Sequence, residues 1–336
     1  MNIAFIPVRG GSKSIPLKNI KPFAGKPLVF WTVTAANNAK NIDKVVVATD
    51  CQKIKDYIVG LQLQKVSVFD RNSVNATDTA STESVMLEFL KSNDASSISE
   101  RDNFVLIQAT SPLLTCTMLD DMISLFIASG KDSALSAVKT KRFFWTDIGT
   151  PINYDYKHRP RRQDFNGCMM ENGAVYINSV NNILKNSCRL SGDIFVYEMP
   201  SYMGYEIDEP DDWIIMERLF FRYGHQGFIS KKTFCFDIDG VIGKKSDIKD
   251  MDGDYSNNIP NENIIEICNK LYDAGHIIII QTARGSGTGT DWSEKTEKQL
   301  KKWGVKYHKL YFGKPPADYY IDDKMLDIDN LRFFIK

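Results

Sequence analysis

The sequence predicts an α/β fold in two units, the second smaller than the first, and three observations support this. The chain has 336 residues, which exceeds one ordinary domain of about 100–200 residues. Short apolar runs rich in β-branched residues alternate with segments whose apolar residues have helical spacing, as in a parallel sheet covered by helices. This pattern is lost over residues 222–232, which include two glycines, and then resumes. We therefore predict domains at 1–229 and 230–336.

Each element follows from the period of its apolar residues. In the first domain, strands are expected at Ile3–Val8, Lys44–Thr49, Phe104–Gln108 and Ala174–Asn178, and helices at Leu28–Ala39 and Ser81–Leu90. In the second domain, strands are expected at Thr233–Ile238, Ile277–Gln281 and Tyr319–Ile321, and helices at Glu262–Ala274 and Glu294–Trp303. The stretch from Lys139 to Gly167 is irregular, aromatic and basic.

The composition excludes several classes of protein. The 42 Lys and Arg balance 42 Asp and Glu, which argues against a nucleic-acid partner and against a polybasic membrane anchor. Apolar runs are shorter than the roughly 18–20 residues of a membrane span. The six cysteines are scattered without a CxxC pair, and the N-terminus lacks the features of a signal peptide. We expect a cytoplasmic protein with reduced thiols.

A glycine-rich basic loop follows the first strand. It runs from Arg9 to Asn19 and contains Gly10 and Gly11, which allow close approach of a ligand to the backbone. Three cations stand at the carboxyl end of a strand, where open α/β sheets bind ligands; they are Arg9, Lys13 and Lys18. The loop is either a triphosphate-binding site or a solvated turn.

Four segments resemble the N-acylneuraminate (sialic acid) cytidylyltransferases. They cover nearly all of residues 1–220: Arg9–Asn19 with 23–32, Arg71 with 76–82, 106–113, and 160–163 with 171–174. The resemblance implies a Rossmann-like, glycosyltransferase-A-like nucleotidyltransferase domain. It also implies that the anomeric hydroxyl of a 2-keto sugar acid attacks the α-phosphate of CTP, so that CMP is transferred and pyrophosphate leaves.

The resemblance also implies roles for individual residues. Lys18 and Arg9 would stabilise phosphoryl charge in the transition state. Arg161 would bind the carboxylate of the sugar acid, unless it is an ordinary loop arginine. The remaining nucleotide-binding and substrate-binding candidates are Gly10, Gly11, Ser12, Lys13, Asn19, Arg71, Thr82, Gln108, Gln163 and Asn172.

One or two Mg²⁺ ions are expected at this first site, held by Glu206 and Asp208. If this segment is a strand, its alternation places both carboxylates on one face. Many members of the family have aspartate at position 206 and glycine at the positions of Ser14 and Leu17. Asp211 and Asp212 are either ligands or caps of a following helix.

Motifs in the second domain resemble a haloacid dehalogenase-like phosphatase. They are Asp237-Ile238-Asp239 at the end of a strand, Thr282-Ala283-Arg284, Gly313-Lys314-Pro315 and Asp322-Asp323. The resemblance implies one Mg²⁺ ion and an aspartyl-phosphate on the nucleophile Asp237, with Asp239 as general acid and base. The resemblance also implies that Thr282 and Lys314 contact the phosphoryl group and that Arg284 contacts the substrate. The implied metal ligands are Asp237, Asp239, Asp322 and Asp323.

The combined prediction is a bifunctional enzyme of nonulosonic acid activation. One domain would dephosphorylate a sugar acid phosphate, and the other would load the free acid onto CMP. Two alternatives remain. In one, the second domain is a non-catalytic oligomerisation module. In the other, the first domain is a 3-deoxy-octulosonate cytidylyltransferase, a member of a family with a different basic loop.

Members of the sialic acid family form dimers in which an extension of one subunit completes the pocket of the other. We therefore expect a homodimer or higher oligomer, with this extension at Lys139–Gly167.

Overall fold

A computed structural model describes residues 1–77, 79–224, 232–244, 255, 258–315, 317 and 325–326. The chain divides into two compact units, Met1–Phe220 and Phe221–Lys336. The predicted boundary between 229 and 230 falls outside the described residues. Each unit has its own buried apolar core, so we describe each by itself.

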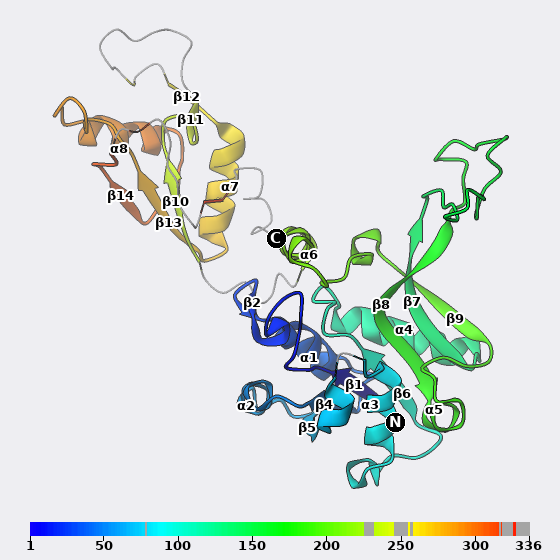
Figure 1. Cartoon of the computed structure of the whole chain (residues 1–336). Coiled ribbons are helices and arrows are strands. Elements are labelled where there is room, and N and C mark those ends of the chain that lie inside the picture. Colours follow the sequence, from blue (N-terminus) through cyan, green and yellow to red (C-terminus); the bar gives the residue numbers. More distant parts are fainter. Residues whose placement is uncertain are drawn as a thin grey trace. The chain divides into compact units, whose positions relative to one another are not determined.

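The first unit is built on a seven-stranded sheet with the order β5-β4-β1-β6-β8-β7-β9 (Figure 1). The first four strands in this order are parallel, as predicted, whereas β8 is antiparallel to both of its neighbours. The strands are β1 (Asn2–Pro7), β4 (Lys44–Thr49), β5 (Val66–Asp70), β6 (Asn103–Ile107), β7 (Ser133–Thr140), β8 (Cys168–Ser179) and β9 (Ile194–Met199).

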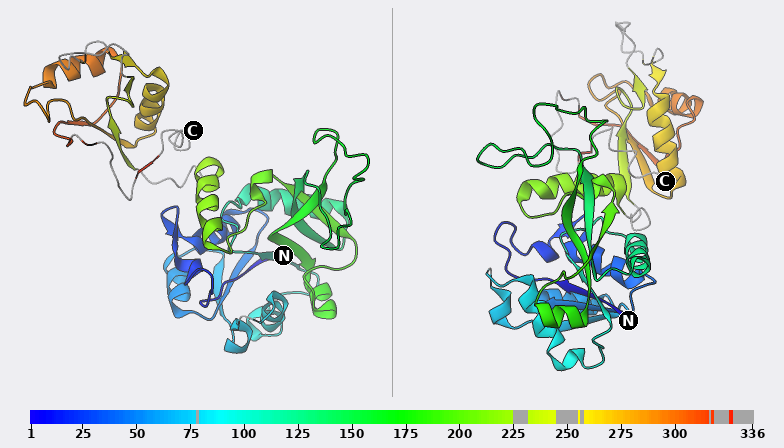
Figure 2. Two further views of the ribbon diagram at one scale, coloured as in Figure 1. Left: turned by 45° about the horizontal axis from the view of Figure 1, so that its top comes forward. Right: turned by 90° about the vertical axis from the view of Figure 1, so that its right-hand side faces the viewer.

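Helices cover both faces of this sheet (Figure 2). In β1, Ala4 and Ile6 join one core cluster and Ile3 and Phe5 join the other, which explains why the strand is apolar throughout. The helices are α1 (Leu28–Asn38), α2 (Gln52–Gly60), α3 (Thr82–Leu90), α4 (Cys116–Ser129), α5 (Val180–Asn186) and α6 (Pro210–Tyr223). Shorter elements are η1 (Lys18–Ile20), η2 (Ser73–Ala76), η3 (Asn93–Ala95), η4 (Ser201–Met203) and the pair β2 (Pro22–Phe23) and β3 (Lys26–Pro27).

Residues 141–167, which we call the arm, project from the ends of β7 and β8 (Figure 1). A small aromatic cluster organises the arm, with the Phe143 ring centroid 4.1 Å from that of Tyr154 and 4.8 Å from that of Phe165. The Arg159 guanidinium lies 4.6 Å from the Phe143 ring. Trp145 and Ile148 remain exposed. The arm is thus a basic, partly apolar projection, as the sequence predicts for this stretch.

The second unit contains a three-stranded parallel sheet with the order β10-β13-β14. Its elements are β10 (Thr233–Asp237), β11 (Gly243–Lys244), β12 (Ile259–Pro260), α7 (Glu262–Asp273), β13 (Ile277–Gln281), α8 (Ser293–Lys302) and β14 (Lys309–Tyr311). Phe236, Ile278 and Ile280 pack against Leu271 of α7 in its core. The sequence analysis missed β14, and its expected third strand at Tyr319–Ile321 lies outside the described residues.

Candidate active sites

The loop after β1 is closed by one of its own predicted ligands. Asn19 is buried, and its Nδ2 donates to the Arg9 carbonyl oxygen at 3.0 Å, which joins the two ends of the loop. The Gly10 N–H donates to Asp50 Oδ1 at 3.0 Å. A Cβ at Gly10 would lie 2.7 Å from Cys51 Cβ, so only glycine permits this approach to the chain after β4.

Lys18 brings this loop to the acidic segment before α6. Its Nζ donates to the Ile207 carbonyl oxygen at 2.6 Å and pairs with Asp208 Oδ1 at 3.2 Å. Ser14 Oγ donates to Glu209 Oε1 at 2.9 Å. The structure therefore places the predicted phosphate-binding loop beside the predicted magnesium segment, although almost 200 residues separate them in the sequence.

The acidic segment differs from its predicted conformation. Residues 205–208 form no strand, so the alternation argument for Glu206 and Asp208 was wrong. Asp212 accepts hydrogen bonds from the backbone N–H groups of Asp208 and Glu209 at 3.1 and 2.8 Å, which fixes the turn into α6. Asp212 thus acts as a cap.

Glu206 lies against Gly173 of β8. A Cβ at Gly173 of β8 would lie 2.2 Å from Glu206 Oε1, which places the carboxylate directly over this glycine. Burial, together with the negative charges of Asp208 and Glu171 and against the effect of Lys18, raises the pKa of Glu206 to about 7. Burial is the largest cause, and a divalent cation beside these carboxylates would offset the repulsion that Asp208 and Glu171 add.

These carboxylates are chemically suited to Mg²⁺, which prefers oxygen ligands and retains several that are not from protein. Among the described residues, no three His, Cys, Asp or Glu side chains form a group that could hold a metal ion. A magnesium ion at Glu206 and Asp208 would therefore take other ligands from phosphate or water.

A cavity of about 250 Å³ adjoins Glu206. Its polar lining includes two carboxylates, one amide, one phenol and one guanidinium. The lining residues are Gln108, Glu171, Gly173, Tyr176, Arg189 and Glu206. The Tyr176 hydroxyl donates to Glu171, and Arg189 pairs with Glu83 of α3 at 2.6 Å. Such a lining matches a ligand with many hydroxyl groups.

The sequence analysis assigned Gln108 to this region and missed Glu171, Tyr176 and Arg189 as cavity residues. Glu171 stood inside a quoted motif but was given no role. Tyr176 and Arg189 carried no signal in the sequence, because their position depends on how β8 and the chain after α5 pack.

Asn172, a predicted substrate ligand, requires a correction. It is 2% exposed, and its amide group bonds to Ser136 Oγ at 2.7 Å and to the Met203 carbonyl oxygen at 3.0 Å.

Other predicted nucleotide ligands lie around the same sheet edge. Arg71 follows β5, and its Nε donates to the Asn75 carbonyl oxygen at 2.7 Å. The pKa of the Arg71 guanidinium lies below its ordinary value, because the lowering effect of burial exceeds the raising effect of the charges of Asp50 and Glu88. Thr82 is the first residue of α3. Gly11, Ser12 and Lys13 lie on the loop after β1.

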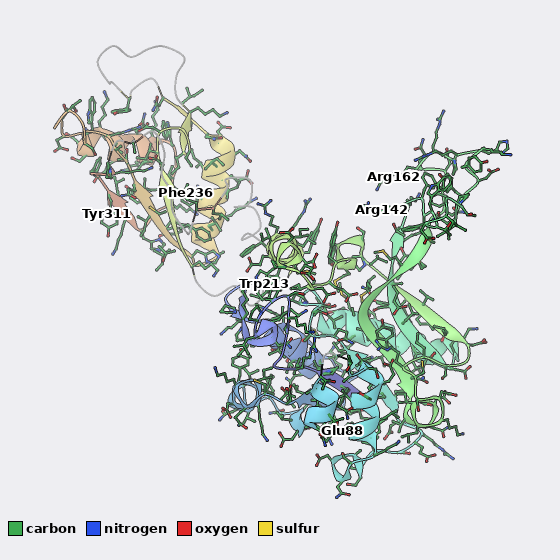
Figure 3. All side chains as sticks on the ribbon, in the orientation of Figure 1. Glu88, Arg142, Arg162, Trp213, Phe236 and Tyr311 are labelled. Carbon is green, nitrogen blue, oxygen red and sulfur yellow. The ribbon has the colours of Figure 1, made fainter. Side chains whose placement is uncertain are left out.

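Arg161 and Gln163 do not join these residues within the chain. Both are exposed on the arm, and Figure 3 shows the neighbouring Arg162 projecting with the arm away from the sheet. They are absent from the lining of the cavity.

The second unit places Lys314 against the predicted nucleophile. Lys314 Nζ donates to Asp237 Oδ2 at 2.6 Å, from a loop after β14 to the end of β10. Thr282, at the end of β13, is fully buried, and its Oγ1 accepts from the backbone N–H of Arg284 at 3.2 Å. Three of the predicted motifs thus meet at the carboxyl edge of this sheet.

Arg284 requires a correction. It is 3% exposed, and Asp239 accepts hydrogen bonds from its Nε and Nη2 at 2.9 and 2.7 Å. This arginine is bound by the protein, so it does not stand as an exposed substrate contact. Among the described carboxylates expected at the metal, Asp237 and Asp239 both remain partly exposed, with side-chain exposures of 30% and 18%. Asp322 and Asp323 lie outside the described residues.

Comparison with known proteins assigns the first unit. Residues 3–167 match the family model "Cytidylyltransferase". An N-acylneuraminate cytidylyltransferase from Oncorhynchus mykiss is 35% identical over 231 residues, 67% of this chain and 51% of that protein. A pseudaminic acid cytidylyltransferase from Campylobacter jejuni is 27% identical over 234 residues, 67% of this chain and 98% of that protein. The chain spans about half the length of the first of these relatives.

A solved structure of a CMP:2-keto-3-deoxy-manno-octonic acid synthetase complexed with CTP aligns with 65% of this chain and 98% of its own, at 14% identity and a TM-score of 0.48. None of the helices in the described parts of the chain has the length and apolar character of a membrane span. The family match of residues 3–167 includes the glycine-rich loop and strands β1, β4, β5, β6 and β7, and about 230 residues are similar to N-acylneuraminate cytidylyltransferases.

Proposed function

We propose that the first unit transfers CMP from CTP to a nonulosonic acid of the sialic acid type and releases pyrophosphate. The observation that carries this proposal is the meeting of Lys18 with the segment of Glu206 and Asp208, next to a polar cavity. The similarity to N-acylneuraminate and pseudaminic acid cytidylyltransferases supports the substrate class.

In this proposal the chain acts through positioning and charge. The anomeric oxygen of the acid attacks the α-phosphorus of CTP, the bond to the β-phosphate oxygen breaks, and pyrophosphate leaves. Lys18, held by the Ile207 carbonyl oxygen, stabilises the charge on phosphoryl oxygens. Arg9 and Arg71 bind the nucleotide, and the cavity residues accept and donate hydrogen bonds to the sugar. Mg²⁺ held by Glu206 and Asp208 would neutralise phosphate charge when bound.

The test is pyrophosphate release from CTP and Mg²⁺ with a panel of sialic, legionaminic, pseudaminic and 3-deoxy-octulosonic acids. Lys18→Met should lower kcat by about 10²–10³-fold, the usual size of one lost electrostatic contact. Lys53→Met, which removes an exposed cation from α2, is the matched control and should be neutral. Release with none of the nonulosonic acids would refute the proposal, and release only with the octulosonic acid would favour the alternative family.

We propose a second activity, hydrolysis of a sugar phosphate by the second unit. The supporting observation is the 2.6 Å pair of Lys314 and Asp237 at the edge of a parallel sheet, beside Thr282 and Asp239. Asp237 would attack phosphorus, and Lys314 would offset the charge that gathers there. Asp237 offers a hard oxygen ligand that suits Mg²⁺, which would further neutralise the phosphate when bound.

Asp237→Asn separates this proposal from a non-catalytic oligomerisation module. The substitution should abolish phosphate release from phosphorylated nonulosonic acids and leave CMP transfer unchanged. Lys298→Met on α8, which breaks an exposed ion pair with Glu294, is the control. Loss of assembly in Asp237→Asn without any phosphatase activity in the unmodified chain would favour the oligomerisation module.

A further inference from the structure

The predicted acid and base of the second unit, Asp239, is held by an arginine from a different strand end. Arg284 Nε donates to Asp239 Oδ2 at 2.9 Å, and Nη2 donates to Oδ1 at 2.7 Å. Asn258 Nδ2 donates to the same Oδ1 at 2.7 Å. Both carboxylate oxygens are therefore engaged, and a bidentate pair of this kind fixes the plane of the carboxylate as well as its position.

The arginine is itself anchored on the side away from Asp239. Its Nη1 donates to Thr296 Oγ1 at 3.2 Å and to Gln299 Oε1 at 2.8 Å, both on α8. The guanidinium lies 4.3 Å from the ring of Tyr255. A fully formed set of partners for a buried cation means that Arg284 cannot move freely, so the orientation that it gives to Asp239 is rigid.

The proposed chemistry depends on that orientation. In the first step Asp237 forms a bond to phosphorus, the bond from phosphorus to the leaving oxygen breaks, and Asp239 gives this oxygen a proton. In the second step water attacks the aspartyl-phosphate, its proton passes to Asp239, and Asp237 is released as a carboxylate with phosphate. A proton transfer needs its donor within hydrogen-bond distance of the leaving oxygen.

We propose that Arg284 is a positioning residue that holds Asp239 for these proton transfers and does not itself bind substrate. This inference rests on the proposed phosphatase activity. It predicts that loss of Arg284 harms reactions that need a proton from Asp239 and spares those that do not.

The test compares two substrates of similar shape, phenyl phosphate and p-nitrophenyl phosphate, with the full chain and Mg²⁺. Phenolate leaves poorly without a proton, whereas p-nitrophenolate leaves well without one. Arg284→Lys and Arg284→Met should lower the first-turnover release of phenol by about 10–100-fold and that of p-nitrophenol by less than about threefold, in the range of general acid catalysis. The substrate concentration that gives the half-maximal first-turnover rate should be unchanged for both, and Asp239→Asn should show the same pattern.

Circular dichroism and thermal unfolding identify any variant that fails to fold. In that case Gln299→Ala, which loosens Arg284 from α8, decides the question and should give a smaller loss of the same pattern. A raised KM with unchanged kcat would show that Arg284 binds substrate, and an equal loss with both phosphates would show a general structural role. Either result overturns the inference alone. No release by the unmodified chain overturns the phosphatase proposal and this inference together.

Discussion

Glu206 illustrates how one residue links the proposed metal site to pH. Burial and the neighbouring Asp208 and Glu171 raise its pKa to about 7. Because only the carboxylate binds Mg²⁺, the proton and the metal compete below pH 7 and not above it. The Mg²⁺ concentration for half-maximal pyrophosphate release should therefore rise by up to about tenfold as pH falls from 7 to 6.

Glu206→Gln provides the control for this prediction. The amide has no proton to lose in this range, so any remaining pH dependence reports on CTP and other groups. The prediction fails if the Mg²⁺ requirement of the unmodified chain changes with pH in the same way as that of Glu206→Gln.

Gly173 is a second residue whose identity is dictated by its neighbour. Its φ is +66°, and a Cβ would meet the Glu206 carboxylate at 2.2 Å. Gly173→Ala should therefore displace Glu206, raise the KM for the sugar acid, and weaken the Mg²⁺ requirement that Glu206 confers. Gly25→Ala is the matched control, because Gly25 has a φ of +84° and open space at the Cβ position. Equal effects of the two variants would attribute everything to backbone strain.

At the scale of elements, η1 carries Lys18 and begins after a strained residue. Leu17 has φ 52° and ψ 34°, in the left-handed region that costs a non-glycine residue roughly 1–2 kcal/mol. Glycine, which adopts this conformation without a steric penalty, would be the unstrained residue here.

Substitution of Leu17 should reveal this strain. Leu17→Asn should raise the free energy of unfolding of the first unit by about 0.5–1 kcal/mol, because Asn tolerates this conformation. Leu17→Val should lower it by about 1 kcal/mol, because a branched Cβ fits it poorly. Denaturant unfolding followed by tryptophan fluorescence measures both, and a stabilising Leu17→Val would contradict the assignment of strain.

At the scale of the whole molecule, the arm raises the question of how Arg161 and Gln163 reach a sugar. Both are exposed on the arm and do not line the cavity of their own chain. We infer that in a homodimer the arm of one subunit completes the site of the other, which would cover exposed Trp145 and Ile148.

Mixed subunits test this inference. Lys18→Met and Arg161→Ala should each be inactive as homodimers. After subunit exchange at equal amounts, half of the dimers combine the two variants, and one site in each has both an intact Lys18 and an intact Arg161. Activity should therefore recover to about one quarter of that of the unmodified protein. No recovery, with exchange verified by mass spectrometry, would place both residues at the site of one subunit.

Local patterns predicted much of the fold correctly. Apolar runs located β1, β4, β6, β10 and β13, because buried parallel strands need continuous apolar sequence. The same approach missed β14, which has only the three residues Lys309–Tyr311. It also relied on strand alternation at Glu206 and Asp208, where contacts with Lys18 and Asp212 hold a backbone that is not a strand. Short segments carry too little periodicity to outweigh tertiary contacts.

The sequence by itself determined the α/β class, the two units, and the motifs that supply cations after β1 in the first unit and carboxylates after β10 in the second. Tertiary structure alone decided the direction of each side chain. It turned Asn172 into the core, bound Arg284 to Asp239, and brought Glu171, Tyr176 and Arg189 to one cavity. The reason is physical: a motif specifies which groups are available, but packing and hydrogen-bond satisfaction determine which of them remain accessible to a ligand.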